Sequence, residues 1–123
     1  MNLNTVRVFV RDIAPAKRFY EQSLGLALRV DGSRYGYCVF DAGNTTLVVE
    51  VVGDDAPEDE QVLVGRFTGL SFAVRDVNAK YAELLSRGVA FSGAPELQTW
   101  GGSVATLRDP AGNELQIAQH PVT

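Results

Sequence analysis

The amino-acid sequence predicts an α+β protein made of two βαβββ modules, because one pattern of residues occurs in both halves of the chain. Val10-Arg11-Asp12-Ile13 returns about 64 residues later as Val74-Arg75-Asp76-Val77. Each copy follows a strand-like apolar run and precedes a run with helical spacing. A second pair of similar segments, at 41–44 and 109–113, carries turn residues. Two copies are too few for a solenoid, so the repeat favours a pseudo-symmetric domain with a site between its halves.

The length and composition indicate a single domain with a net negative charge. The chain has 123 residues, of which 46% are hydrophobic and 21% charged, as in a globular protein with a sizeable core. The net charge of −4 argues against a nucleic-acid partner, which would need clustered basic residues. No apolar run approaches the roughly 20 residues of a membrane span. Five acids at 54–60 crowd one short stretch, which we interpret as a solvated linker.

The first residues and the cysteine content favour a cytoplasmic protein. The opening stretch 1–4 has no basic region and no long apolar core, so we expect no signal peptide. Cys38 is the only cysteine, which rules out an internal disulfide and fits a reducing compartment. We interpret Cys38 as a small buried apolar residue, because no His stands near it in the sequence to activate the thiol.

The first module is expected at about 3–52. Its first strand, 5–10, alternates, with Val6, Val8 and Val10 on one face. Asp12 suits a helix N-cap, and Gly25 suits the end of that helix. Three further strands are expected at about 27–30, 35–40 and 46–51.

The second module, at about 66–120, follows the acidic linker at about 53–65. A strand is expected at 68–74, with Gly69, Ser71 and Ala73 on one face. Asp76 caps a helix whose predicted apolar face is Val77, Tyr81, Leu84 and Leu85. The remaining strands are expected at 89–91, 103–108 and 114–119, with a loop at 95–102. A helix covers one face of each sheet, so we expect the two open faces to enclose a cleft.

Several motifs of the chain resemble the vicinal oxygen chelate superfamily. They are the Val-Arg-Asp pattern, Phe19-Tyr20, Leu24-Gly25-Leu26, and Arg108-Asp109-Pro110-Ala111-Gly112-Asn113 before the last strand. That superfamily contains glyoxalase I, extradiol dioxygenases, fosfomycin-modifying enzymes and bleomycin-resistance proteins. The resemblance implies a glyoxalase-like half-barrel domain over 1–123 and a homodimer, possibly with swapped modules. One fold carries many activities, so the resemblance does not choose among them.

The resemblance also implies four positions at which relatives hold a metal. Carried over residue by residue, they fall at Thr5, at Val48 or Glu50, at Gly69, and at Gln116. Glycine offers no side-chain donor, and a neutral amide binds divalent cations weakly. His120 is the only histidine and is interpreted as a surface residue beyond the last strand. We therefore predict no metal and no other cofactor.

Two charged residues on inward strands have open interpretations. Glu50 could contact a ligand or act as a general base, or it could be paired with Arg7. Arg7 could hold an anionic ligand, or it could be the structural partner of Glu50.

Four aromatic residues are candidates for a clamp over a flat ligand, or else for ordinary packing. Packing in the core or at a dimer interface is favoured for Phe9 and Tyr37, although both remain candidates for ligand contact, and Tyr35 is left open. Trp100 stands in a glycine-flanked loop and favours ligand contact.

The sequence therefore predicts a small-molecule-binding protein that sequesters a planar or aromatic compound without changing it. No residue is assigned a catalytic role. The predicted ligand-binding residues are Thr5, Arg7, Phe9, Tyr37, Glu50, Trp100 and Gln116. The alternative is a glyoxalase-like lyase or isomerase, or a dioxygenase, with an atypical metal site. A third reading is a metal-free lyase or isomerase with Glu50 as base.

Overall fold

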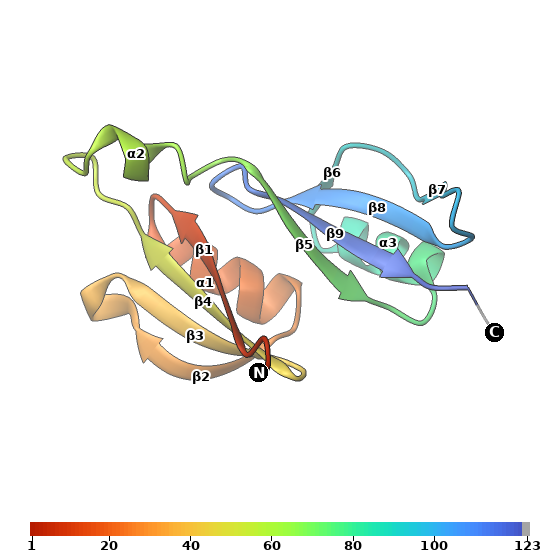
Figure 1. Ribbon diagram of the computed structural model, residues 1–123, viewed down its shortest axis with the longest axis horizontal. Coiled ribbons are helices and arrows are strands. Elements are labelled where there is room, and N and C mark those ends of the chain that lie inside the picture. Colours follow the sequence, from red (N-terminus) through yellow and green to blue (C-terminus); the bar gives the residue numbers. More distant parts are fainter. Residues whose placement is uncertain (122–123) are drawn as a thin grey trace. The chain divides into compact units, whose positions relative to one another are not determined.

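The computed structural model of the protein describes residues 1–121. The chain forms two compact units, which are described separately (Figure 1). Unit 1 comprises Met1–Arg66 together with the turn Pro110–Asn113, and unit 2 comprises Phe67–Asp109 and the chain from Glu114 onward.

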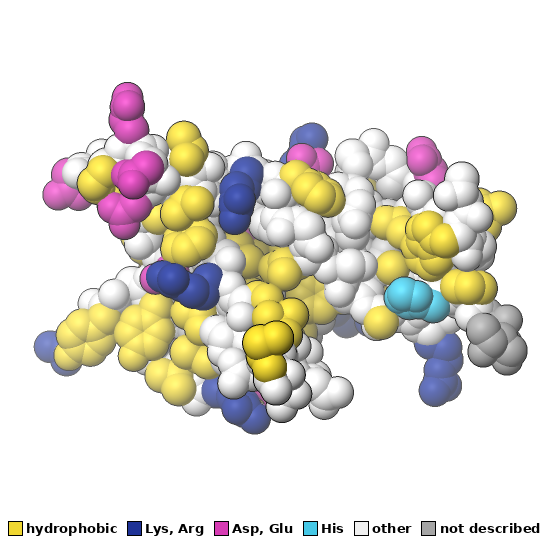
Figure 2. Space-filling model, viewed as in Figure 1, with side chains coloured by type: hydrophobic (Ala, Val, Ile, Leu, Met, Phe, Trp, Pro, Cys, Tyr) yellow, Lys and Arg dark blue, Asp and Glu magenta, His cyan; other side chains and the backbone are white. Residues whose placement is uncertain are grey.

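Unit 1 contains a four-stranded sheet in the order β1-β4-β3-β2. The first strand runs parallel to β4, and the other neighbours are antiparallel. Its strands are β1 (Thr5–Val10), β2 (Ala27–Gly32), β3 (Tyr37–Ala42) and β4 (Thr45–Val51). Its helical segments are α1 (Ile13–Arg18), the π-helical η1 (Phe19–Ser23), the 3₁₀ turn η2 (Ser33–Tyr35) and α2 (Glu58–Gln61). Figure 2 shows acidic side chains gathered on α2.

Unit 2 repeats this topology, with the sheet order β5-β9-β8-β6 and a short β7 paired to β8. The parallel pair is β5 with β9. Its elements are β5 (Phe67–Ala73), α3 (Val77–Ser86), β6 (Ala90–Phe91), β7 (Glu96–Leu97), β8 (Ser103–Arg108) and β9 (Glu114–Gln119). The predicted α+β class with two βαβββ patterns is therefore confirmed.

The predicted helix starts are confirmed by the capping contacts. The Asp12 carboxylate accepts a hydrogen bond from the Ala14 amide at 3.3 Å, and the Asp76 carboxylate accepts one from the Ala79 amide at 3.0 Å. Each contact satisfies an amide that has no partner within the first turn of a helix. Gly25, after the first helical segment, has a φ of 77°, which favours glycine.

Some predicted boundaries are wrong. The strand expected from residue 35 begins at Tyr37, because Tyr35 belongs to the 3₁₀ turn η2, whose C-cap is Gly36 with a φ of 82°. The expected linker contains α2, and the expected loop at 95–102 contains β7. Leu85, which is expected on the apolar face of α3, is 44% exposed, whereas Val77 and Leu84 are buried.

Each unit builds its core between one face of the sheet and its long helix. In unit 1, α1 packs on β3 and β4 (Figure 1). The predicted alternation of β1 is confirmed, because Val8 and Val10 are buried and Arg7 is exposed. Tyr20 is fully buried and its ring lies 5.9 Å from that of Phe40. Cys38 is also fully buried, as expected for a small apolar residue.

Asn113 does more than complete a turn. Its side chain is fully buried within unit 1. The amide oxygen accepts hydrogen bonds from the backbone N–H groups of Gly65 at 2.9 Å and Arg66 at 3.3 Å, and the amide nitrogen donates to the Phe9 carbonyl at 2.7 Å. One side chain thereby satisfies three backbone groups of segments that are distant in the sequence.

In the part of the chain that the structure describes, no helix has the length and apolar character needed to cross a bilayer.

Candidate functional site

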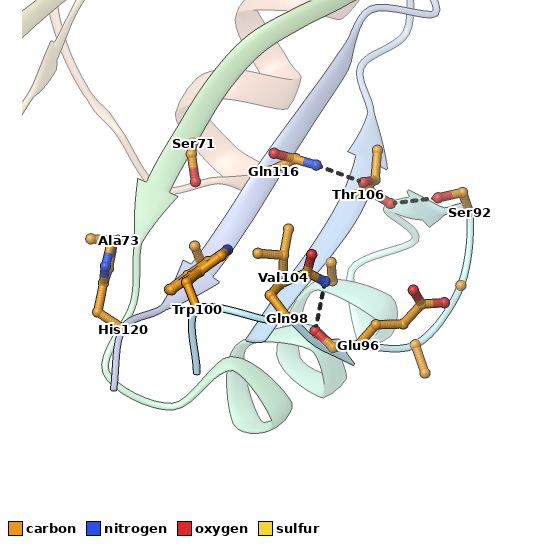
Figure 3. A pocket seen from close by; sticks show the side chains of 14 residues that line it. Ser71, Ala73, Ser92, Glu96, Gln98, Trp100, Val104, Thr106, Gln116 and His120 are labelled. Atoms are coloured by element: carbon orange, nitrogen blue, oxygen red, sulfur yellow. Dashed lines mark hydrogen bonds between the residues drawn. The ribbon is translucent and has the colours of Figure 1, made fainter. Parts of the chain in front are cut away.

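The face of the unit 2 sheet that points away from α3 is hollowed into an open cavity of about 560 Å³ (Figure 3). Its wall comes from β5, β8 and β9, from the 92–100 segment, which includes Glu96 of β7, and from His120. The residues that line it are Ser71, Ala73, Ser92, Gly93, Ala94, Glu96, Gln98, Trp100, Val104, Ala105, Thr106, Gln116, Ala118 and His120.

The cavity exists because unit 2 carries small side chains where unit 1 carries large ones. In unit 1, Glu50 of β4 is opposite Phe9 of β1 and Tyr37 of β3. The equivalent β9 residue of unit 2, Ala118, is opposite Ala73 and Val104. The repeat therefore matches Phe9 with Ala73, Glu50 with Ala118, Tyr37 with Val104, and Arg7 with Ser71.

On the matching face of unit 1, the side chains of Arg7, Glu50 and Phe9 contact one another. Arg7 donates a hydrogen bond to the Glu50 carboxylate, and its guanidinium lies 5.2 Å from the centroid of the Phe9 ring. That hydrogen bond and the charge of Glu50 raise the pKa of Arg7. The Tyr37 ring lies over Gly32, where an added Cβ would be 2.4 Å from the ring. Of the two interpretations of Glu50, the structure therefore shows the pairing with Arg7.

Trp100 forms one wall of the cavity and is 49% exposed. Its position depends on Gly102, because a Cβ at that residue would lie 1.9 Å from the indole Cζ3 atom. The ring also packs against the imidazole of His120, with 5.3 Å between the ring centroids (Figure 3). The backbone N–H of Gln98 donates a hydrogen bond of 2.8 Å to the backbone carbonyl of Gly102, which closes the loop that carries Trp100.

Polar groups occupy other parts of the cavity wall. The Gln116 amide donates to the Thr106 hydroxyl at 3.3 Å, and the Gln98 side chain donates to the Glu96 carbonyl at 3.0 Å (Figure 3). Ser71 lies opposite Gln116 on the neighbouring strand. The site therefore offers hydroxyl and amide groups beside an aromatic surface, which is typical of small-molecule pockets.

The four positions that the resemblance implies for a metal do not offer a donor set that fits a divalent cation. The Thr5 hydroxyl donates to the Asn4 side chain at 2.9 Å, and Glu50 is paired with Arg7. Gly69 has no side-chain donor, and Gln116 supplies only a neutral amide. Among residues 1–121, no three His, Cys, Asp or Glu side chains form a group that could hold a metal ion.

The strand registers of the two units also show which residue of β4 occupies the position equivalent to Gln116 of β9. Gln116 is opposite Ser71, and the residue that matches Ser71 in unit 1, Arg7, is opposite Val48. Internal symmetry thus equates Gln116 with Val48, whose side chain has no donor atom.

The structure divides the predicted ligand-binding residues between the two units. Trp100 and Gln116 both line the cavity of unit 2. Thr5, Arg7, Phe9, Tyr37 and Glu50 lie on unit 1 strands, so they do not belong to this cavity. Tyr35 is 78% exposed and lies outside both sheets.

Sequence reasoning missed several residues of the cavity. The sequence predicts a loop at Glu96 and Gln98, whereas Glu96 of β7 pairs with Val104 of β8. His120 is exposed, as expected for a surface residue, but it also lines the cavity. Ser71 and Ala73 lie on the strand face that the sequence predicts, but they are not among the predicted site residues, and neither is Thr106.

The chain matches the model of the Glyoxalase/Bleomycin resistance protein/Dioxygenase superfamily over residues 2–117. It therefore belongs to that superfamily. The uncharacterized protein YraH of Bacillus subtilis (strain 168) is 31% identical over 125 residues, which cover 95% of this chain and 97% of YraH.

Solved structures are similar over almost the whole chain, and two of them illustrate this. A superfamily member from Sphaerobacter thermophilus DSM 20745 has a TM-score of 0.81 and 25% identity, with 98% of each chain covered. TnmS3, an antibiotic binding protein from Streptomyces sp. CB03234, has a TM-score of 0.78 and 29% identity, with 98% of this chain and 97% of TnmS3 covered.

Proposed function

We propose that the protein binds a planar or aromatic small molecule in the unit 2 cavity, without a metal and without changing the molecule covalently. The observation that carries this proposal is the exposed Trp100 ring in the wall of a cavity built on small side chains. Such a cavity leaves room for a flat molecule against the indole face, where stacking adds to the burial of apolar surface.

The size and chemistry of the cavity support binding of a small molecule. A volume of about 560 Å³ lies within the range of ligand sites, roughly 300–1,000 Å³. The polar groups of Ser71, Thr106 and Gln116 supply hydrogen-bonding positions that fix the orientation of a ligand. The similarity to TnmS3, which is an antibiotic binding protein, favours an antibiotic-like ligand.

The donor chemistry supports binding over catalysis. A glyoxalase-like or dioxygenase activity would need a metal site. Of the positions implied by the superfamily, Gln116 offers an amide, Thr5 offers a hydroxyl and Gly69 offers no donor. The fourth position is either Val48, which has no donor, or Glu50, whose carboxylate is already paired with Arg7. A metal-free reaction with Glu50 as base would have to displace Arg7 from that carboxylate.

Tryptophan fluorescence tests this proposal, because Trp100 is the only tryptophan in the chain. Titration with neutral planar compounds such as acridone and anthraquinone is expected to quench the emission saturably, with a stoichiometry of about one. The non-planar compound camphor, at the same concentrations, is the control and should leave the emission unchanged. Emission that no planar compound quenches saturably would contradict the proposal.

A further inference from the structure

The cavity of unit 2 has an uneven distribution of charge. Glu96 is the one carboxylate among its lining residues, and none of the described lining residues is Lys or Arg. The imidazole of His120 is the other ionisable group of the wall, and it packs on the Trp100 ring. An anionic molecule would therefore find no fixed positive charge from a Lys or Arg in this site.

The Glu96 carboxylate is available to a ligand. Within residues 1–121 it has no ion-pair partner and accepts no hydrogen bond, because Gln98 donates to the backbone carbonyl of Glu96 instead. Two other carboxylates show the contrast: Glu50 is paired with Arg7, and Glu83 lies 2.6 Å from the Lys80 ammonium. An unpaired carboxylate in a ligand cavity favours a positively charged guest.

Glu96 and Trp100 are held by the same hairpin. Glu96 and Leu97 pair with Val104 and Ser103 of β8, and the connecting loop is closed by the Gln98–Gly102 hydrogen bond. Figure 3 shows Trp100 and Glu96 at different ends of the cavity, with Gln98 and Val104 between them. A flat molecule on the indole can therefore extend toward the carboxylate.

We infer that this cavity selects planar cations over neutral and anionic molecules of the same shape, with Trp100 as the stacking surface and Glu96 as the counter-charge. The inference rests on the proposed function and specifies its ligand class. An aromatic face attracts a cation through its quadrupole, and the carboxylate attracts it through its charge. A neutral guest gains only the stacking, and an anion is repelled by Glu96.

Three acridines with one ring system and different charge test the preference. The probes are 9-aminoacridine as the cation, acridone as the neutral compound and acridine-9-carboxylate as the anion, each titrated by calorimetry at pH 7.5 and low salt. We expect the cation to bind about tenfold more tightly than acridone, through the combined ion pair and cation–π contact, and the anion to bind most weakly.

The variant Glu96→Gln assigns the preference to this side chain. It should lower the affinity for 9-aminoacridine toward that for acridone, so that only the preference from the cation–π contact with Trp100 remains, and it should leave the affinity for acridone unchanged. Glu60→Gln is the matched control, because it removes one negative charge from an exposed residue of α2 outside the cavity. It should change neither affinity.

The outcomes separate this inference from the proposed function. If the three acridines bind equally, or if Glu96→Gln keeps the full preference for the cation, the charge selection is overturned while binding of a planar guest stands. If none of the three compounds binds, the proposed function itself is contradicted and the charge selection falls with it.

Discussion

At the scale of single residues, the cavity depends on the absence of a side chain at Gly102. The indole of Trp100 occupies the space into which a Cβ on Gly102 would project. That Cβ would also lie 2.6 Å from the backbone carbonyl oxygen of Gln119. Gly102 is not among the glycines with positive φ, so the requirement is steric rather than conformational.

Gly102→Ala is expected to displace the Trp100 ring and to weaken binding of acridone at least tenfold. Because the new methyl group also meets the backbone of β9, unfolding free energy should fall by about 1–3 kcal/mol. Gly93→Ala is the matched control for stability, since a Cβ at that glycine would meet nothing within 4 Å. Calorimetry and urea unfolding measure both effects, and unchanged binding in Gly102→Ala would contradict this role of Gly102.

Asp31 gives a second expectation at this scale, for the dependence of stability on pH. The hydroxyl and amide of Ser33 lower the pKa of the Asp31 carboxyl to about 2, and the Lys17 ammonium at 3.2 Å acts in the same direction. Because the folded-state pKa lies below the unfolded value of about 3.9, the stabilisation is fully present above pH of about 4. It is lost as the pH falls toward about 2.

Asp31→Asn should therefore lower the urea midpoint at pH 7, and the difference from the parent protein should shrink as the pH falls from about 4 to about 2. Asp54→Asn removes an exposed linker carboxylate and is the control. A difference that stays constant over this pH range would show that the charge of Asp31 does not stabilise the fold.

At the scale of elements, the two sheets share a strand order but differ on the face away from the helix. Three of the larger side chains of unit 1 contact one another there, whereas the Ala73, Val104 and Ala118 positions of unit 2 leave a cavity. The difference lies in the side chains, because both sheets have the same pairing of parallel and antiparallel strands.

Ala73→Phe places on β5 the residue that unit 1 has at the matching position of β1. We expect it to fill the cavity and lower the affinity for acridone more than tenfold, with a change in unfolding free energy within about 0.5 kcal/mol because Ala73 is exposed. Ala90→Phe is the control, an equal substitution on an exposed residue of β6 outside the cavity. Calorimetry that finds full affinity in Ala73→Phe would place the binding site elsewhere.

Elements with a strong local signal could be predicted from the sequence, and short elements could not. The helix caps Asp12 and Asp76 and the last two strands were predicted because cap residues and alternation are local features. The two-residue β7 has no periodicity of its own and exists through its pairing with β8. Glu96 was missed for that reason.

At the scale of the whole molecule, the internal repeat predicted both units and their common topology. The glycine-flanked loop singles out Trp100 and the resemblance singles out Gln116, and both line the cavity, whereas their contact with a ligand stays a prediction. The cavity itself could not, since it arises from side-chain sizes compared across paired strands. The cleft expected between the modules, the homodimer and its possible module swap stay predictions.

Calorimetric titration of a planar compound into protein dialysed exhaustively against EDTA tests the central claim most directly. We predict an isotherm with about one site for acridone or 9-aminoacridine, unchanged when nickel, zinc or manganese is supplied. The account would be contradicted by binding that appears only with a stoichiometric, tightly held metal ion.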